Sequence, residues 1–317
     1  MKIVLLDAEN VNTGELSWAP LEALGDVVFY PQTAKEQIVE RAEDADAVFI
    51  NKVALSGEVL RQLPKLKYVG IFATGYNIVD IDAAKELGIT VCNVPGYSTF
   101  AVVQLTMALL LELCHHVAAL SQSVHDGVWS QNVNLNILGK PSVELLGKTM
   151  GIVGFGDIGQ QVGRVAKAFG MDVIFYNPRP KDGQGFAQQV AFEELLKTAD
   201  VVSLHCPLFP ENRKMMNREA FALMKESAFV LNTARGPLVD EEALAEALNS
   251  GKIAGAGLDV VSVEPILDEN PLLSAPNCIL TPHIGWAPTE TRERLIQLSA
   301  QNLKAFQNGA PIHVVNP

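Results

Sequence analysis

The chain has 317 residues, 48% of them hydrophobic and 19% charged. This length is enough for two cores of ordinary size, because domains usually contain about 100 to 200 residues. The formal net charge is −12, with 24 basic and 36 acidic residues. Such an acidic chain argues against a binder of nucleic acid or of anionic membranes, since both depend on basic patches.

Neither the cysteines nor the start of the chain points to export or to a membrane. The four cysteines are far apart in the sequence and form no C-x-x-C pair. The amino terminus lacks a signal-peptide pattern, and the most apolar run, residues 100–113, is shorter than the roughly 20 residues of a membrane span. The sequence therefore predicts a cytoplasmic protein.

The first hundred residues alternate short β-rich runs with helical patterns. Strict alternation predicts a parallel sheet that is covered by helices on both faces. The expected strands are 3–6, 27–30, 47–50, 68–71 and 90–93, and the expected helices are 15–24, 34–42, 56–62 and 81–87.

A long apolar segment from Ser98 or Thr99 to about Ser123 predicts one buried connector helix. Residues 127–147 show no periodicity, which fits an arm or a partner-contacting loop. A second series then has expected strands at 149–153, 172–176, 201–204, 228–231, 255–258 and 278–280, and expected helices at 158–169, 192–197 and 241–249. A last expected helix, 289–306, has no strand after it and could cross back to the first domain.

Three glycines form the pattern G-x-G-x-x-G between an apolar strand and an amphipathic helix: Gly154, Gly156 and Gly159. This strand-turn-helix context is what a dinucleotide-binding unit requires. The first glycine allows the tight turn, the second lets a pyrophosphate approach the backbone, and the third allows close helix packing. The pattern predicts a dinucleotide site; the alternative is a glycine-rich turn without a ligand.

The choice of cofactor depends on the end of the next strand. An acidic residue about 20 positions after the glycines usually binds the adenosine ribose. That place holds Asn177, followed closely by Arg179. Asn177 can bind a ribose hydroxyl without repelling a 2′-phosphate, and Arg179 could pair with that phosphate or be a solvated loop charge. NADP is therefore permitted, and NAD is not excluded.

Three polar residues follow expected strands of the second unit, where ligands of open α/β sheets bind: Arg235, Glu264 and His283. Reduction of a 2-oxo acid requires a cation for the carboxylate, a proton donor for the ketone oxygen and a well-placed hydride donor. Arginine gives two parallel hydrogen bonds, histidine exchanges protons near neutral pH, and a carboxylate on its second nitrogen fixes the ring. Each residue also has a structural alternative. Arg235 could form an ion pair at a helix cap, Glu264 could be a loop carboxylate, and His283 could be a buried structural histidine.

The other histidines of the sequence show no metal-binding pattern.

Four segments of the chain resemble the D-isomer-specific 2-hydroxyacid dehydrogenases, and the match covers nearly the whole length. They are 146–159 with the glycines, 232–240 around Arg235, 257–265 with Glu264, and 281–286 around His283. The resemblance implies that Arg235 binds the substrate carboxylate and carbonyl, that His283 is the acid/base, and that Glu264 is its partner. It also implies that backbone N–H groups around Thr74 and Gly75 complete the carboxylate site.

For the cofactor, the resemblance implies several further contacts. It places Asp157 and Ile158 at the pyrophosphate, Cys206 and Pro207 beside the adenine, Thr233 near the nicotinamide and Asp259 on its carboxamide. The alternatives are that Cys206 is simply a small buried residue and that Asp259 caps a loop.

The family architecture implies two Rossmann-like or flavodoxin-like domains with parallel sheets. A dinucleotide-binding domain, 99–287, would be inserted into a substrate-binding domain made of 1–98 and 288–317, and 127–147 would be the arm of a homodimer. The segments 97–99, 126–130 and 283–286 look most like the glycerate dehydrogenase and hydroxypyruvate reductase branch. The expected substrate is therefore D-glycerate with hydroxypyruvate, or glyoxylate.

Two other functions stay open. One is a relative that acts on lactate, a longer branched or aromatic 2-hydroxy acid, or formate, which a substrate panel would separate. The other is a dinucleotide-sensing interaction protein, because this fold also serves transcriptional corepressors.

Overall fold

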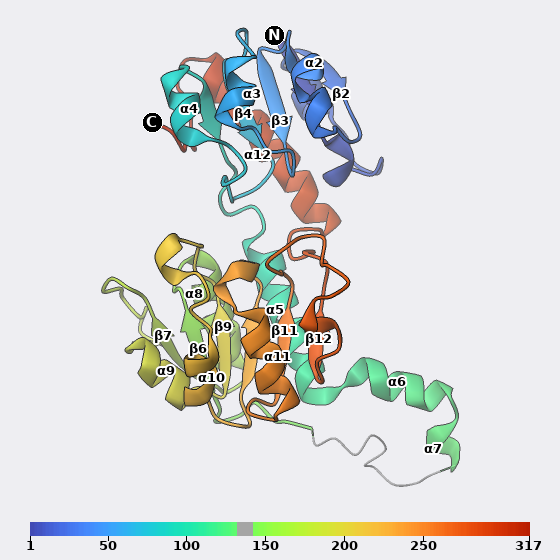
Figure 1. The fold of residues 1–317 in the computed structure, drawn as a ribbon, viewed down its shortest axis with the longest axis vertical. Coiled ribbons are helices and arrows are strands. Elements are labelled where there is room, and N and C mark those ends of the chain that lie inside the picture. The colour runs from blue at the N-terminus through green and yellow to red at the C-terminus, as the bar shows by residue number, and fades with distance from the viewer. Residues whose placement is uncertain (132–141) are drawn as a thin grey trace. The chain divides into compact units, whose positions relative to one another are not determined.

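The computed structural model describes residues 1–131 and 142–317. The chain divides into two compact units, one made of Met1–Ser98 with Ala287–Pro317 and the other of Thr99–Trp286. Each unit is a parallel sheet with helices on both faces, which confirms the predicted α/β class (Figure 1). The second unit is inserted between two segments of the first.

The first unit has a five-stranded parallel sheet in the order β2-β1-β3-β4-β5. Its strands are β1 (Lys2–Leu5), β2 (Asp26–Phe29), β3 (Ala47–Ile50), β4 (Tyr68–Ile71) and β5 (Thr90–Cys92). Its α-helices are α1 (Ala19–Glu22), α2 (Ile38–Ala42), α3 (Gly57–Arg61), α4 (Ile81–Glu86) and α12 (Thr289–Gln307). Apolar residues of α2, α3 and α4 pack into one core with the sheet. Helix α12 packs against β4, where the rings of Tyr68 and Phe306 lie 5.0 Å apart.

The carboxyl-terminal segment covers β5, the edge strand of this sheet. Val315 N donates to Val91 O at 2.9 Å, and an antiparallel bridge joins Val314 to Cys92. The side chain of Asn316 accepts from Val91 N at 2.9 Å and donates to Ile89 O at 2.7 Å. Backbone groups that an edge strand would leave unpaired are therefore satisfied by the end of the chain.

The second unit has a seven-stranded parallel sheet in the order β12-β11-β10-β9-β6-β7-β8. Its strands are β6 (Thr149–Val153), β7 (Asp172–Tyr176), β8 (Gln188–Gln189), β9 (Val201–Leu204), β10 (Phe229–Asn232), β11 (Gly255–Leu258) and β12 (Cys278–Leu280). The strand order reverses direction at β6, which lies between β9 and β7. In open α/β sheets, ligands bind at the carboxyl ends of the strands on either side of such a point.

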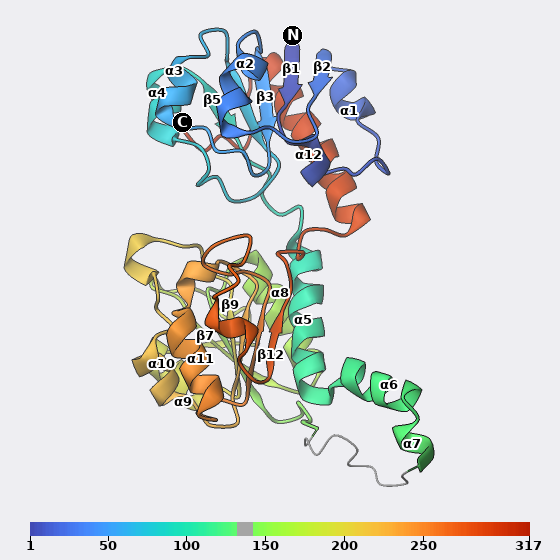
Figure 2. The same ribbon diagram turned by 45° about the vertical axis from the view of Figure 1, so that its right-hand side comes forward.

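Helices cover both faces of this sheet (Figure 2), and each face has its own hydrophobic core. Helices α5 (Thr99–His115) and α8 (Asp157–Ala168) pack on one face, and α9 (Phe192–Thr198), α10 (Arg218–Leu223) and α11 (Glu241–Asn249) pack on the other. Gly257 allows the close approach of α5 to the sheet, because a Cβ there would lie 3.0 Å from Leu109 Cβ.

The prediction of a single connector helix is wrong. The chain breaks at His116, whose φ of 51° is left-handed, and α6 (Val117–His125) leaves α5 at an angle of 56°. Helix α6 then leads to a short α7 (Val128–Gln131) (Figure 1). Residues 132–141 of the predicted arm lie outside the described residues.

Among the described residues, no single helix is long and apolar enough to cross a membrane. In the described part of the chain, α5 and α6 have the length and composition of a span only when the bent pair is taken together, and α5 packs in the core of the second unit.

Candidate functional site

Three neighbouring strands carry the three polar residues singled out in the sequence. Arg235 follows β10, Glu264 follows β11 and His283 follows β12, and these strands are adjacent in the order β12-β11-β10. Because all are parallel, their carboxyl ends meet at one edge of the sheet. The structure thus brings the three loops together at the edge where ligands of such sheets bind.

His283 and Glu264 form a direct pair. His283 Nδ1 lies 2.7 Å from Glu264 Oε2, and the two side chains are 30% and 31% exposed. A carboxylate at Nδ1 requires a proton on that nitrogen, so the tautomer and the ring orientation are fixed. The other ring nitrogen, Nε2, is then the atom that can exchange a proton with a bound molecule.

The loop of His283 is held by Asp259, which is 2% exposed. Asp259 Oδ1 accepts from Ile284 N at 2.8 Å and from Thr281 Oγ1 at 2.6 Å, and Oδ2 accepts from Gly285 N at 2.8 Å. These bonds surround His283, whose φ of 55° places its backbone in the left-handed region. Asp259 therefore caps this loop; its predicted contact with a carboxamide stays a prediction.

The loop of Arg235 is built on a buried asparagine and a close glycine. Asn232 is fully buried, its Nδ2 donates to Arg235 O at 2.9 Å, and its Oδ1 accepts from Ala234 N at 3.0 Å. A Cβ on Gly236 would lie 2.0 Å from the backbone of Val261, so only glycine permits this contact. The glycine thereby joins the Arg235 loop to the loop that carries Glu264.

Thr233, in the same turn, bonds to helix α5. Its Oγ1 lies 2.9 Å from Thr106 Oγ1, which also lies 2.8 Å from Val102 O. The carbonyl can only accept, so the single Thr106 proton goes to Val102 and Thr233 donates to Thr106. The hydroxyl of Thr233 is thereby oriented by α5.

The glycine-rich turn has the geometry of a phosphate site. Gly154 has a φ of 95°, and a Cβ there would lie 2.6 Å from Cys206 N. A Cβ on Gly159 would lie 2.3 Å from Gly154 O, whereas a Cβ on Gly156 would meet nothing within 4 Å. Two glycines thus close the turn and the third leaves room for a ligand. The turn opens the 12-residue helix α8 at Asp157 and Ile158, whose N-terminus favours anions.

Asn177 at the end of β7 is tied to this turn. Its Oδ1 accepts from Phe155 N at 2.8 Å, which leaves the donor group Nδ2 for other partners. Gln189 Nε2 donates to the carbonyls of Asn177 and Arg179 at 3.0 and 3.1 Å. The short strand β8 therefore fixes the segment from Asn177 to Arg179, a role that the sequence patterns did not show.

Cys206 and Pro207 follow β9 and lie beside the glycine-rich turn, since Gly154 packs on the Cys206 backbone. Burial raises the pKa of the Cys206 thiol to about 11. Asn212 Nδ2 donates to Pro207 O at 2.8 Å, which orders the loop. The thiol is therefore protonated at neutral pH, and Cys206 provides a small apolar surface rather than a nucleophile.

Sequence reasoning assigned no role to a partly buried histidine in this loop. His205 Nε2 lies 2.8 Å from Ser203 Oγ, its Nδ1 has no partner among the described residues, and its burial lowers its pKa from 6.5 to about 3. Below pH 6.5 the unfolded chain binds a proton here and the folded chain does not. The free energy of unfolding therefore falls with pH from about 6.5 towards 3.

We expect this residue to shape the acid sensitivity of the protein. When the pH falls from 7 to 5, proton binding by His205 in the unfolded chain should lower the free energy of unfolding by about 2 kcal/mol. Urea titrations of the parent and of His205→Gln at both pH values measure this change. The free energy of unfolding of the variant should fall by about 2 kcal/mol less than that of the parent on acidification. Equal losses in the two proteins would contradict the prediction.

In the first unit, Thr74 and Gly75 follow β4. Ala73 O accepts from Val94 N at 2.9 Å, and Thr74 O accepts from Asn93 Nδ2 at 2.7 Å. A trans peptide points its C=O and N–H in opposite directions, so the N–H groups of Thr74 and Gly75 point away from these partners. Neither N–H donates to an acceptor in the described part of the chain. Two adjacent free N–H groups form a ready anion site.

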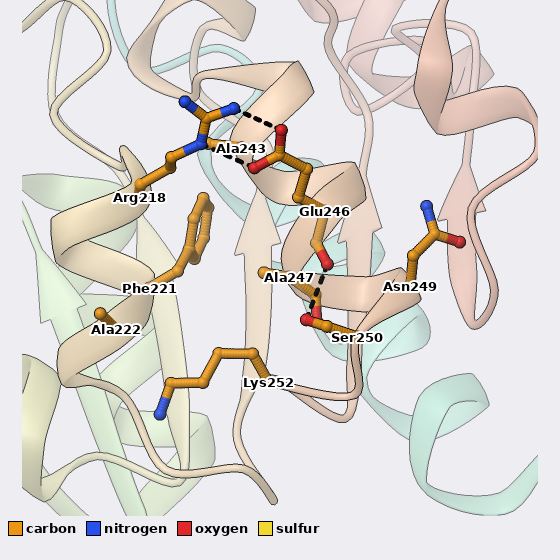
Figure 3. Close-up of a pocket in the computed structure, with 9 residues that line it drawn as sticks. All are labelled: Arg218, Phe221, Ala222, Ala243, Glu246, Ala247, Asn249, Ser250 and Lys252. Atoms are coloured by element: carbon orange, nitrogen blue, oxygen red, sulfur yellow. Dashed lines mark hydrogen bonds and ion pairs between the residues drawn. The ribbon is translucent and has the colours of Figure 1, made fainter.

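Two grooves of the second unit lie away from these residues. A shallow groove of about 660 Å³ runs between α10 and α11, where Arg218 pairs with Glu246 (Figure 3). Another of about 630 Å³ includes Thr149 and Asp172, at the amino ends of β6 and β7. Neither includes a predicted site residue. Within residues 1–131 and 142–317, no group of histidine, cysteine and carboxylate side chains could hold a metal ion.

The chain is similar to a known enzyme family and to several of its characterised members. The family model for the NAD-binding domain of D-isomer-specific 2-hydroxyacid dehydrogenases matches residues 107–285. A hydroxypyruvate reductase of Blautia hydrogenotrophica is 49% identical over 321 residues, covering 100% of both chains. A glycerate dehydrogenase of Methylorubrum extorquens is 40% identical over 282 residues, covering 88% of each chain.

Among solved structures, the chain is similar to the acyclic imino acid reductase Bsp5 in complex with NADPH and D-Arg. The TM-score is 0.89 at 30% identity, covering 99% of this chain and 100% of the other. The family match extends over more than half of the chain and includes the glycine-rich turn. The chain therefore belongs to the D-isomer-specific 2-hydroxyacid dehydrogenases, oxidoreductases that use a nicotinamide cofactor and act on the CH–OH group of a small hydroxy acid.

Proposed function

We propose that the protein reduces hydroxypyruvate and glyoxylate to D-glycerate and glycolate. The observation that carries this is the pair His283–Glu264 beside the Arg235 loop, on three adjacent strand ends of the sheet that also bears the glycine-rich turn. Full-length similarity at 49% identity to a hydroxypyruvate reductase supports the choice of substrate.

In this proposal, the guanidinium of Arg235 binds the substrate carboxylate. Within the first unit, the N–H groups of Thr74 and Gly75 are proposed as a second carboxylate-binding group. Arg235 also polarises the ketone, since its planar fork can bond two oxygens at once. His283 gives the proton from Nε2 to the oxygen of the ketone, and Glu264 stabilises the imidazolium before that transfer. A nicotinamide cofactor, when bound, would supply the hydride for this reduction. In the oxidative direction His283 takes the proton back.

For the cofactor, we propose that the glycine-rich turn and the start of α8 bind the pyrophosphate. The open space at Gly156 and the helix N-terminus fit this group. Cys206 and Pro207 would line the adenine site, and Thr233 and Asp259 would lie near the nicotinamide. The domain 99–287 is then the dinucleotide-binding domain, and 1–98 with 288–317 the substrate-binding domain.

The first experiment is a set of initial rates with NADH and NADPH, each against hydroxypyruvate, glyoxylate, pyruvate and a branched 2-oxo acid. Fast reduction of the first two supports the proposal. A preference for pyruvate or the branched acid would favour the alternative of another 2-hydroxyacid dehydrogenase. Cofactor binding without reduction of any acid would favour a dinucleotide-sensing interaction protein.

We further propose that NADPH is accepted as well as NADH. With Asn177 Oδ1 bonded to Phe155 N, the group offered to the ribose side is the donor Nδ2, which suits phosphate oxygens. Arg179 is exposed nearby and adds a cation. Asn177→Asp keeps the bond to Phe155 but adds a negative charge, so we expect the NADPH to NADH ratio of kcat/KM to fall about tenfold or more.

Two controls make this test specific. Arg179→Ala should weaken NADPH use and leave NADH use unchanged, and NADH rates of Asn177→Asp should stay near those of the parent. An unchanged ratio in Asn177→Asp would contradict a role for this residue in cofactor choice.

We propose that the protein is a homodimer whose interface includes α6 and α7. These helices run out from the sheet of their unit (Figures 1 and 2). They expose Val117, Val124 and Trp129 at 60%, 44% and 57%. Exposed large apolar side chains on two successive helices favour a protein interface. The mass in solution, measured by light scattering, tests it.

A further inference from the structure

A line of hydrogen bonds connects the carboxyl-terminal segment to the Thr74 turn within the first unit. His313 Nδ1 lies 2.9 Å from Asn302 Oδ1, Asn302 Nδ2 donates to Asn93 O at 2.8 Å, and Asn93 Nδ2 donates to Thr74 O at 2.7 Å. A return bond runs from Asn93 N to His313 O at 3.3 Å. Helix α12, the segment after β5 and the chain end are thus joined to the turn that follows β4.

The donor and the acceptor of each side-chain hydrogen bond in this network can be assigned. A backbone carbonyl only accepts, so Asn302 must turn Nδ2 to Asn93 O and Asn93 must turn Nδ2 to Thr74 O. The Oδ1 of Asn302 is then left to accept from the protonated Nδ1 of His313. Asn302 is 1% exposed and Asn93 is 8% exposed, so water cannot readily replace a lost partner.

The last bond of the network sets the orientation of one peptide group. Since the Thr74–Gly75 peptide is planar, fixing Thr74 O towards Asn93 fixes Gly75 N–H in the opposite direction. The side chain of Thr74 adds a second tie, from Oγ1 to Val94 O at 3.0 Å. Without the amide of Asn93, this peptide could rotate and turn its N–H away from an incoming anion.

We propose that Asn302 is a positioning residue for substrate recognition, acting through Asn93 to hold Gly75 N–H towards the substrate carboxylate. This inference rests on the proposed function, in which that N–H binds the carboxylate. It makes the last helix and the end of the chain part of the carboxylate site, although neither contacts the substrate. The N–H bonds the carboxylate in the ground state and in the transition state alike, so its loss raises KM and spares kcat.

A matched control exists in the same region. Asn316 is also buried, at 9% exposure, and its amide also accepts one bond and donates another, to Val91 N and Ile89 O. Both asparagines anchor the carboxyl-terminal part of the unit near β5. Only Asn302 is joined to the Thr74 turn, so a purely structural role predicts the same behaviour for both.

The experiment compares Asn302→Ala with Asn316→Ala in the full-length protein. The measured quantities are the thermal midpoint, kcat and KM for hydroxypyruvate, the affinity for oxalate in the presence of NADH, and the affinity for NADH itself. We expect both variants to lose thermal stability. Only Asn302→Ala should show a KM and an oxalate Kd raised about tenfold, with kcat within about threefold of the parent and NADH affinity unchanged.

If Asn302→Ala does not fold, His313→Ala replaces it, because His313 is exposed and loses one bond only. Its KM should rise about threefold, and an unchanged KM would overturn the inference. Equal KM values for Asn302→Ala, Asn316→Ala and the parent would likewise overturn it while the proposed function stands. A parent protein that neither reduces 2-oxo acids nor binds oxalate would overturn both.

Discussion

Replacing His283 with alanine is expected to lower kcat for hydroxypyruvate reduction about 10²- to 10⁴-fold, the usual contribution of a general acid. The variant keeps the binding groups of Arg235 and of the Thr74 turn, so KM should change little. The fold should persist, because the loop is held by Asp259 and not by the imidazole. Initial rates at saturating substrate and cofactor measure the effect.

A substitution of Glu264, the partner of His283, tests the same step and should have a smaller effect on kcat. Glu264→Gln keeps an oxygen that can accept from His283 Nδ1 but removes the charge, so its kcat should fall less than that of His283→Ala. Glu269→Gln, in the same loop and exposed, serves as the control and should behave as the parent. A His283→Ala enzyme with kcat within threefold of the parent would rule out His283 as the acid.

Arg235→Lys is expected to lower kcat/KM on the order of 10²- to 10³-fold, even though the charge is retained. Lysine is a point charge and cannot give the two parallel bonds of a guanidinium, and truncating one partner of a close charge pair costs about 2 to 5 kcal/mol. The backbone turn should survive, since Asn232 holds it through main-chain atoms. Rates at substrate concentrations well below KM give kcat/KM directly.

Cofactor binding provides the control for Arg235. Fluorescence titration with NADH should give the same Kd for Arg235→Lys and the parent, because Arg235 is assigned to substrate alone. Arg213→Lys, an exposed arginine of the same unit, should leave all constants unchanged. A kcat/KM for Arg235→Lys near that of the parent would show that another cation binds the carboxylate.

Much of the fold could be predicted from the sequence because strands of buried parallel sheets are apolar runs with clear ends. The predicted 47–50, 149–153 and 255–258 match β3, β6 and β11 residue for residue. Periodicity failed where elements are short or polar. It missed β8, whose two glutamines have no apolar alternation, and α10, and it extended α1 to 15–24 although the helix is only Ala19–Glu22.

The site was predicted in part for a similar reason. The positions of Arg235, Glu264 and His283 follow from where strands end, which a local pattern reveals. The hydrogen bonds that hold these loops do not. Asn232 bonds to two backbone groups of its own turn, Gln189 bonds to two carbonyls about ten residues earlier, and Asp259 bonds to three groups more than twenty residues later. Periodicity reports which side chains are buried, and it carries no information on which distant partner a buried amide or carboxylate finds.

The discontinuous first unit constrains the order in which the protein can fold on the ribosome. When Ser98 emerges, five strands are present, but β5 still lacks the segment that covers its edge, and β4 still lacks α12. The inserted unit, Thr99–Trp286, can complete its own core while the first waits. The exposed strand edge is then the point at which nascent chains are most open to wrong pairing. Slow synthesis of the last thirty or so residues should therefore favour aggregation of the nascent chain.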